Sequence, residues 1–416
     1  MSPIRRMGKN LVFKVLTEAV LRVLSFVFYV ALARWLGEEP FGLFNLLYSV
    51  TAIVVFLVDP GLNIQLIRNA PRKDGYLEQT AGAVLGLKLA LSSLAVITSC
   101  AYGLMAGYDA YVIALLALMG AQMAGYSLLE YASAIFQARE EMQVETFLMG
   151  TGKLLVTGSA IAAIVFGGGL GAVLSVMALS QGAVTVWAFM WTARRGVPVS
   201  VKLSLATWAG LLKGSVPLAA ITFFTITFYR VDIALAPFLG LSLREIGFYA
   251  AGVKIIDVLL AAPTLMMAGV FPTLSAMAED DRAAFSRWMG LVLLSLAFAG
   301  VAAGGAASWF SEEIISILFG AAFAPAAEPL RWLALASVFM FIRHGLLHGL
   351  IIDGRLKPAV LLTSSALPLN VVLNVALAHT WGTVGMASAK LLTELALVGG
   401  AGFVWFAGAR KSGQSG

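Results

Sequence analysis

Long apolar segments recur along the entire sequence, and they constrain the fold more than any other feature. A helix needs roughly 20 apolar residues to cross about 30 Å of hydrocarbon, and such runs follow one another from residue 10 to residue 407. Hydrophobic residues make up 60% of the 416 residues and charged residues only 12%, whereas soluble domains carry roughly 25% charged residues. The sequence therefore predicts an integral membrane protein.

The apolar segments predict an all-α protein with about twelve transmembrane helices, because long uniform runs exclude the alternating pattern of barrel strands. The predicted helices span residues 10–34, 41–59, 79–106, 110–137, 146–167, 170–193, 213–238, 246–275, 286–309, 329–351, 359–379 and 382–407. The longest polar connection, residues 194–212, divides them into two bundles of six helices. We expect an N-terminal bundle at residues 1–200 and a C-terminal bundle at residues 201–416.

A short pattern occurs once in each predicted bundle. Residues 31–37 read ALARWLG and residues 234–240 read ALAPFLG, and Gly42 and Gly247 follow at similar distances. Each copy joins the first two helices of its bundle. An even number of helices per bundle gives both copies the same orientation, so the pattern predicts a parallel repeat around a pseudo-twofold axis along the membrane normal.

Lysine and arginine are distributed unevenly between the loops, which predicts the orientation in the membrane. Only Arg34, Arg244 and Arg331 fall on one side, and the other loop and terminal cations fall on the opposite side. Cytoplasmic loops carry the excess of basic residues, so we expect both termini in the cytoplasm and the protein in the cytoplasmic (inner) membrane. The basic residues in these loops contribute to the net charge of +6. The sequence has no stripe of basic and aromatic residues outside the spans, so we expect no nucleic-acid partner.

Ionisable side chains inside the predicted spans are the candidate functional residues, because each is costly there unless it is paired or hydrated. The cations are Arg22, Lys88, Lys153, Arg230, Lys254, Arg343 and Lys390, and the acids are Glu18, Glu130, Asp232, Asp257 and Glu394. Cations outnumber acids, so some positive charge lacks a partner on its own helix. We expect these seven cations to line a water-filled cavity and to bind an anionic substrate group.

Spacing suggests a structural alternative for several of these charges, because residues three or four apart share a helix face. The predicted pairs are Glu18 with Arg22, Lys254 with Asp257, and Lys390 with Glu394. Arg230 and Asp232 are two residues apart and need partners on other helices. Lys88 and Lys153 lie nearer the inner face, where their ammonium groups could also reach lipid headgroups.

Buried acids can couple transport to an ion gradient. The candidates for ion coupling are Asp232, Asp257, Glu130 and Glu18. Asn370 and Asn374 share the helix predicted at 359–379 and either join helices by hydrogen bonds or face the cavity.

No motif predicts an enzyme. The sequence has no dinucleotide fingerprint and no nucleophile motif, and residues 150–153 lack the other positions of a phosphate loop. His344 and His348 are four residues apart without an evident third ligand, so we expect no metal and no cofactor.

The order of several short motifs resembles the Wzx/RfbX-type polysaccharide biosynthesis flippases of the multidrug/oligosaccharidyl-lipid/polysaccharide (MOP) exporter superfamily. The resemblance covers nearly the whole chain. The matching segments are residues 33–44, 59–62, 230–232, 247–249, 271–275, 318–320, 354–355 and 370–385.

The resemblance implies a MATE-like fold, in which two six-helix bundles surround a central cavity. It also implies a transporter that flips undecaprenyl-pyrophosphate-linked oligosaccharide from the inner to the outer leaflet by alternating access, with cavity cations meeting the pyrophosphate. The expected partners are this lipid-linked oligosaccharide, membrane lipids, H⁺ or Na⁺ as coupling ion, and a polysaccharide polymerase or glycosyltransferases.

The alternative is a MATE-like drug/cation antiporter of the same fold. An antiporter for organic cations would need a net acidic cavity lining, and the surplus of cations argues against it. A membrane-embedded enzyme would need a sizeable polar catalytic loop, which the sequence lacks.

Overall fold

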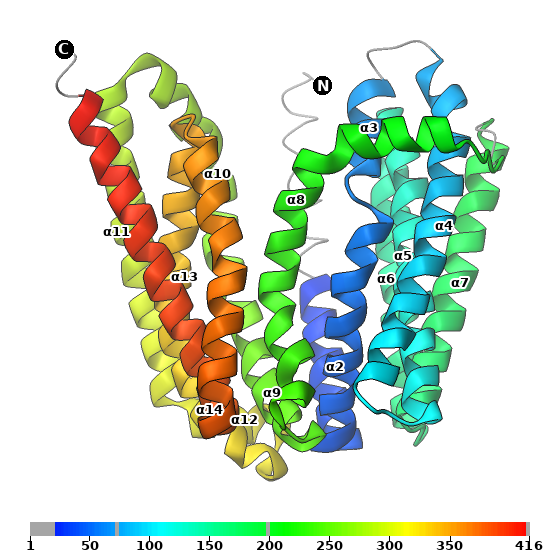
Figure 1. Cartoon of the computed structure of the whole chain (residues 1–416), viewed down its shortest axis with the longest axis horizontal. Coiled ribbons are helices and arrows are strands. Elements are labelled where there is room, and N and C mark those ends of the chain that lie inside the picture. Colours follow the sequence, from blue (N-terminus) through cyan, green and yellow to red (C-terminus); the bar gives the residue numbers. More distant parts are fainter. Residues whose placement is uncertain (1–20, 71–74, 197–199, 413–416) are drawn as a thin grey trace. The chain divides into compact units, whose positions relative to one another are not determined.

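The computed structural model describes residues 21–70, 75–196 and 200–412, and every regular element in these ranges is a helix. The first described helix covers residues 21–36. It is followed by α2 (Glu38–Val55), η1 (Phe56–Val58), α3 (Leu62–Asn69), α4 (Tyr76–Met105), α5 (Ala110–Ala138), α6 (Met142–Val165), α7 (Leu170–Arg194), α8 (Leu205–Leu235), η3 (Ala236–Leu239), α9 (Leu243–Leu259), α10 (Ala261–Asp280), α11 (Arg282–Trp309), α12 (Ser311–Phe319), η4 (Ala321–Ala326), α13 (Ala327–Ile352) and α14 (Leu356–Ser412) (Figure 1).

Ten helical segments of the described residues are long and apolar enough to cross a membrane. Nine of them correspond one to one with predicted helices, and the tenth, Leu356–Trp405, contains the last two predicted helices. These two are separated at Gly382, whose backbone φ of 57° and ψ of −132° is not helical. A side chain strongly disfavours this conformation, which places the turn at the glycine. The multi-pass membrane architecture is therefore confirmed.

The helix predicted at residues 246–275 is two helices in the structure. α9 ends at Leu259 and α10 begins at Ala261, and together they form one apolar segment, Leu243–Asp280. Pro263 has no backbone N–H to donate to the carbonyl of Leu259. The break therefore falls where the proline removes a helical hydrogen bond.

The polar connection between the predicted bundles is shorter than the sequence suggests, because α8 already begins at Leu205. The start of α8 packs on α4, where Trp208 Nε1 donates to the carbonyl of Ala83 at 2.9 Å. The backbone of residues 200–202 also crosses α4, and Lys202 N donates to Gly82 O at 2.9 Å. A side chain at Gly82 would collide with the Ser200 carbonyl, so the glycine permits this approach.

The chain forms two compact units, Met1–Leu36 with Leu46–Ile226, and Gly37–Asn45 with Thr227–Gly416. We call them the N-terminal and C-terminal units. Both α2 and α8 pass from one unit into the other. The predicted bundles at residues 1–200 and 201–416 remain a prediction, since these compact units are not continuous in sequence.

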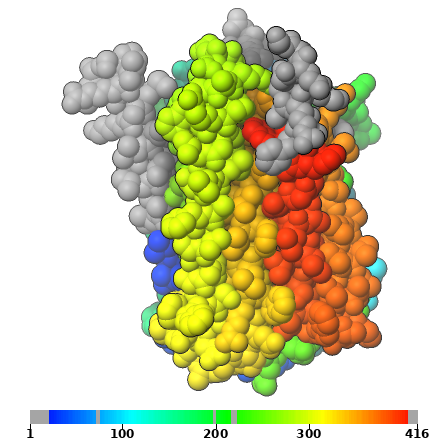
Figure 2. Space-filling model, turned by 90° about the vertical axis from the view of Figure 1, so that its left-hand side faces the viewer, coloured from blue at the N-terminus to red at the C-terminus, as the bar shows by residue number. Residues whose placement is uncertain are grey.

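In the N-terminal unit, α4, α5, α6 and α7 pack against one another, and α3 covers α5. One buried apolar cluster of this unit includes Leu66, Val84 and Tyr131. In the C-terminal unit, α13 packs between α11 and α14. Figure 2 shows α11 and α14 on one face of this unit. The side chains of Leu294 and Phe298 on α11 are exposed. Such apolar exposure suits contact with lipid.

The two copies of the repeated pattern end in the same way, each at a glycine with a positive φ angle. Gly37 and Gly240 end the two sequences with φ angles of 86° and 84°. Gly42 and Gly247 meet within the C-terminal unit in a reciprocal contact: a Cβ on Gly42 would collide with the Leu243 carbonyl, and one on Gly247 with the Glu38 carbonyl. Glu38 and Leu243 are themselves equivalent in the repeat. This exchange of partners is what a twofold relation between the copies requires.

Candidate functional site: two buried ion pairs in the C-terminal unit

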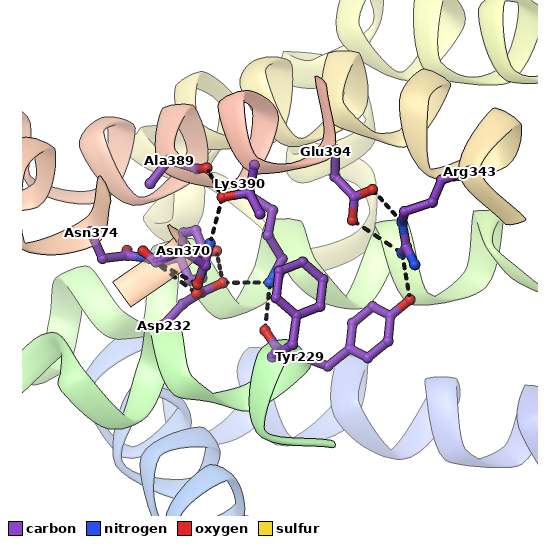
Figure 3. A network of polar contacts seen from close by, with 11 residues as sticks. Tyr229, Asp232, Arg343, Asn370, Asn374, Ala389, Lys390 and Glu394 are labelled. Carbon is purple, nitrogen blue, oxygen red and sulfur yellow. Dashed lines mark hydrogen bonds and ion pairs between the residues drawn. The ribbon is translucent and has the colours of Figure 1, made fainter. Parts of the chain in front are cut away.

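The C-terminal unit buries a network of charged side chains from three helices (Figure 3). α8 contributes Tyr229 and Asp232, and α13 contributes Arg343. The second segment of α14 contributes Lys390 and Glu394. The four charged residues are all buried, so each charge has to be balanced within the network.

Asp232 is held by three donors. Lys390 Nζ lies 2.9 Å from Asp232 Oδ2, and the Tyr249 hydroxyl of α9 donates to the same oxygen at 2.9 Å. Asn374 Nδ2 reaches Asp232 Oδ1 at 3.2 Å. Lys390 also donates to the Phe228 carbonyl at 2.8 Å, and its ammonium lies 4.1 Å from the centre of the Phe228 ring. Both oxygens of the carboxylate and the ammonium are therefore engaged.

Arg343 forms the second pair with Glu394. Its Nε and Nη2 lie 2.5 Å and 3.1 Å from the two carboxylate oxygens, and Nη2 also donates to the Tyr229 hydroxyl at 3.1 Å. This two-point contact matches the planar guanidinium to the planar carboxylate. Glu394 has no solvent exposure, so the arginine is its main source of charge compensation.

The predicted pair of Lys390 with Glu394 is wrong. Both side chains belong to one helix face, but each binds a partner on another helix, namely Asp232 and Arg343. Glu394 receives two hydrogen bonds from the guanidinium fork, which a single ammonium could not supply with the same geometry. The expectation that Asp232 needs partners on other helices is confirmed.

Asn370 and Asn374 belong to this network and join helices by hydrogen bonds. Asn374 Nδ2 contacts Asn370 Oδ1 at 3.1 Å, and Asn370 Nδ2 donates to Thr393 Oγ1 at 3.4 Å. Three buried polar atoms of this unit have no hydrogen-bond partner among the described residues: Asn374 Oδ1, Thr227 Oγ1 and Ser388 Oγ. Buried acceptors of this kind are usually satisfied by water or an ion.

Among the described residues of the N-terminal unit, a buried lysine pairs with a partly exposed aspartate. Lys88 of α4 has no solvent exposure and lies 3.0 Å from Asp59 Oδ2, with Asn63 Oδ1 at 3.2 Å. Asp59 follows η1, and its Oδ1 accepts hydrogen bonds from the backbone N–H groups of Gly61, Leu62 and Asn63 at the start of α3. Asp59 therefore caps α3 and neutralises Lys88 at the same time. The partly buried Glu130 lies close enough to interact with Lys88 and Asp59.

The remaining candidates differ in exposure. Lys254 is buried and pairs with the exposed Asp257 at 3.9 Å, as predicted. Arg22 is exposed, and Lys153 and Arg230 are partly exposed. Glu18, with its predicted pairing to Arg22, lies outside the described residues.

Sequence reasoning did not single out Asp59, Tyr229 and Tyr249 as partners of these charges. Asp59 ends an apolar run, and a buried lysine without an acid on its own helix could have pointed to it. No pattern in the sequence indicates that the two tyrosine hydroxyls face carboxylate or guanidinium groups.

Comparison with known proteins places this architecture in context. The sequence profile described as "Polysaccharide biosynthesis protein" matches residues 7–278, more than half of the chain. The chain belongs to the polysaccharide biosynthesis protein family. A search of curated protein sequences finds no match.

Solved structures similar to this family member are transporters of one fold. The lipid II flippase MurJ, in an inward closed conformation, aligns with a TM-score of 0.76 at 14% identity, covering 94% of this chain and 87% of the flippase. An inward-facing multidrug resistance MATE transporter of the MOP superfamily aligns with a TM-score of 0.69 at 13% identity over 92% and 93% of the chains. The bent form of VcmN, a MATE transporter of Vibrio cholerae, gives a TM-score of 0.57 at 13% identity over 94% of both chains. The MATE-like fold predicted from the sequence is therefore confirmed.

The charged residues of this polysaccharide biosynthesis protein are thus assembled by tertiary packing of a MATE-like fold. Among the candidate cations, Lys88, Lys254, Arg343 and Lys390 each have a carboxylate of the described residues within 4.0 Å. Their assignment as substrate-binding residues stays a prediction.

Among the described residues, no group of three His, Cys, Asp or Glu side chains is arranged to hold a metal ion.

Proposed function

We propose that this protein is a transporter that flips an undecaprenyl-pyrophosphate-linked oligosaccharide from the inner to the outer leaflet of the cytoplasmic membrane, by alternating access. The observation that carries the proposal is the match to the polysaccharide biosynthesis family over residues 7–278. The MurJ-like fold supports it, because the most similar structure described above belongs to a flippase of a lipid-linked substrate. The chain is a transporter and not an enzyme in this proposal, with both termini in the cytoplasm.

The proposed division of labour among the cations follows from their surroundings. Buried ion pairs such as Arg343 with Glu394 are neutral as a unit and rarely add stability over an apolar core, so their presence at membrane depth supports a functional role. We propose that they keep the helices of the C-terminal unit in register during transport. The more exposed Arg22, Lys153 and Arg230 are the cations that contact the pyrophosphate.

Asp232 is the residue that we propose to couple transport to H⁺ or Na⁺. Its carboxylate sits at the centre of the network, and the neighbouring Asn374 Oδ1 is a buried acceptor without a partner among the described residues. Release of Lys390 from Asp232 would expose a carboxylate and an amide oxygen to a proton or a hard cation. The unpartnered oxygen of Asn374 supports the assignment of Asp232 as the coupling residue.

The test measures flipping directly. Purified protein is reconstituted in vesicles with a fluorescent undecaprenyl-pyrophosphate-linked sugar, and the accessible fraction of the sugar is followed over time. Arg230→Gln should slow flipping at least tenfold, while the exposed Arg287→Gln on α11 serves as the matched control and should flip at the wild-type rate. Unchanged flipping by Arg230→Gln would remove this residue from the substrate path.

A drug/cation antiporter is the second candidate, favoured by the TM-score of 0.69 to a MATE transporter. The same vesicles distinguish the two functions. Uptake of a fluorescent organic cation driven by a proton or sodium gradient, together with no movement of the lipid-linked sugar, would replace the flippase with the antiporter.

A further inference from the structure

The N-terminal unit has a cavity at one end of α7. It has a volume of about 510 Å³ and is lined by Trp187, Met190, Trp191, Arg194 and Arg195. Cavities that bind small molecules usually fall between about 300 and 1,000 Å³. The cavity combines aromatic and basic side chains at the point where α7 ends.

The aromatic wall of this cavity is preorganised. The rings of Trp187 and Trp191 lie 5.3 Å apart, and Phe147 of α6 packs against them at 5.9 Å and 5.7 Å. Tryptophan prefers the boundary between hydrocarbon and headgroups. This cluster therefore marks the depth at which a lipid headgroup meets its acyl chains.

Two arginines give the mouth of the cavity a positive charge. Arg194 is exposed and makes no ion pair within the described residues, whereas Arg195 binds Glu141 Oε2 at 3.2 Å and stays half exposed. A third arginine, Arg139, donates to the Arg195 carbonyl. One guanidinium is thus available for an anion, and a second can turn toward it from an exposed pair, which is weak.

An apolar groove continues from the cavity toward the interior of the membrane. A second cavity of about 300 Å³ shares Trp187 with the first and runs between α6 and α7 along Leu155, Ser180 and Val184. Its two hydroxyl groups, of Ser159 and Ser180, form a hydrogen bond with each other at 2.8 Å. They therefore do not need a hydrogen-bond partner from a ligand. From Arg195 to Ser180 the helix rises roughly 22 Å, the depth of one headgroup region with one leaflet of hydrocarbon.

We propose that this groove binds one anionic diacyl phospholipid of the cytoplasmic leaflet. The phosphate lies at Arg194 and Arg195, the glycerol region lies against Trp187 and Trp191, and one acyl chain follows the α6–α7 groove. Charge complementarity with the two arginines selects this occupant over a zwitterionic lipid, and the length of the groove matches a single leaflet. The site is independent of the proposed transport function.

Native mass spectrometry of the full-length protein, titrated with phosphatidylglycerol or phosphatidylcholine, tests the proposal. Wild-type protein should retain one phosphatidylglycerol more tightly than phosphatidylcholine. Arg194→Gln with Arg195→Gln should weaken retention of that lipid about 30-fold, since each basic group near an anionic surface contributes about fivefold. Arg287→Gln, next to Trp288 on α11, has the same residue types on the other unit and should leave retention unchanged.

A second variant tests the acyl-chain groove. Ala183 lines the groove and is exposed, so Ala183→Trp fills the groove without disturbing the core. It should displace phosphatidylglycerol, whereas Val186→Trp, on an exposed position of α7 outside the groove, should not. Equal retention of both phospholipids, or unchanged binding in the arginine double variant, would overturn the proposal. Displacement of the bound phospholipid by the lipid-linked sugar at equal concentration would instead assign the groove to the transported substrate.

Discussion

The two units neutralise their buried cations in different ways. In the N-terminal unit, Lys88 reaches Asp59, whose side chain is 19% exposed and is also bound by backbone N–H groups of α3. In the C-terminal unit, Lys390 and Arg343 bind Asp232 and Glu394, whose side chains are 3% and 0% exposed.

This difference shows which carboxylates depend on their cation. If Lys88 were removed, Asp59 would still contact solvent and accept hydrogen bonds from three backbone N–H groups. If Arg343 were removed, Glu394 would have neither. The N-terminal pair is therefore tolerant of losing its cation, and the pair of Arg343 with Glu394 is not. Four experiments, ordered by expected effect, test this contrast.

The largest effect is expected for Arg343→Met. It leaves Glu394 charged, buried and without its two guanidinium bonds, and breaking a buried pair in this way costs about 3–5 kcal/mol. Thermal unfolding in detergent should show a large loss of stability. The double variant Arg343→Met with Glu394→Gln removes both charges and should recover most of it; a double variant as unstable as the single one would contradict the pairing.

Asp232→Asn should have the next largest effect. It removes the negative partner of Lys390, but the ammonium keeps the Phe228 carbonyl and the Phe228 ring. The expected cost is about 1.5–3 kcal/mol, the range for a hydrogen bond to a charged group. The same unfolding assay measures it, and flipping in vesicles should lose its dependence on the coupling ion. Retained ion dependence would show that the coupling residue lies elsewhere.

Lys88→Met should cost less than either, about 1 kcal/mol, because Asp59 still accepts backbone hydrogen bonds and contacts solvent. Asp59→Ala should cost clearly more than Lys88→Met, since it removes the cap of α3 and leaves Lys88 buried without its carboxylate. Comparing the two melting temperatures checks this asymmetry. Equal shifts in melting temperature for Lys88→Met and Asp59→Ala would contradict this asymmetry.

The smallest effect is expected for Asp257→Asn. Its carboxylate is 42% exposed and lies 3.9 Å from the buried Lys254. Solvent at the exposed carboxylate screens the attraction, so the pair contributes below about 1 kcal/mol. The melting temperature should stay close to that of the wild type. A shift as large as that of Asp232→Asn would place Asp257 among the structural charges of the C-terminal unit.

Helix positions were predictable because the membrane imposes a length and a composition on every span. The segments at 110–137 and 170–193 agree with α5 and α7 to within a residue. Breaks inside long apolar runs were harder, and the interruption between Leu259 and Ala261 was missed although Pro263 was visible in the sequence.

Charge pairing was predictable only where both partners share one helix. Lys254 and Asp257 are such a case. Lys390 and Glu394 have the right spacing too, yet neither binds the other. Spacing identifies neighbours on a helix face, but a buried charge takes the partner that offers the best geometry among all nearby helices.

The sequence alone therefore determined the membrane class, the helical spans, the repeat and the family. The length of the apolar segments, the loop charges and the short motifs are all local features of the sequence. Tertiary structure decided which charges neutralise one another and which remain accessible. Asp59 and Lys88, or Arg343 and Glu394, lie far apart in sequence, and the energy of each charge depends on the distance and exposure that only packing of the helices sets.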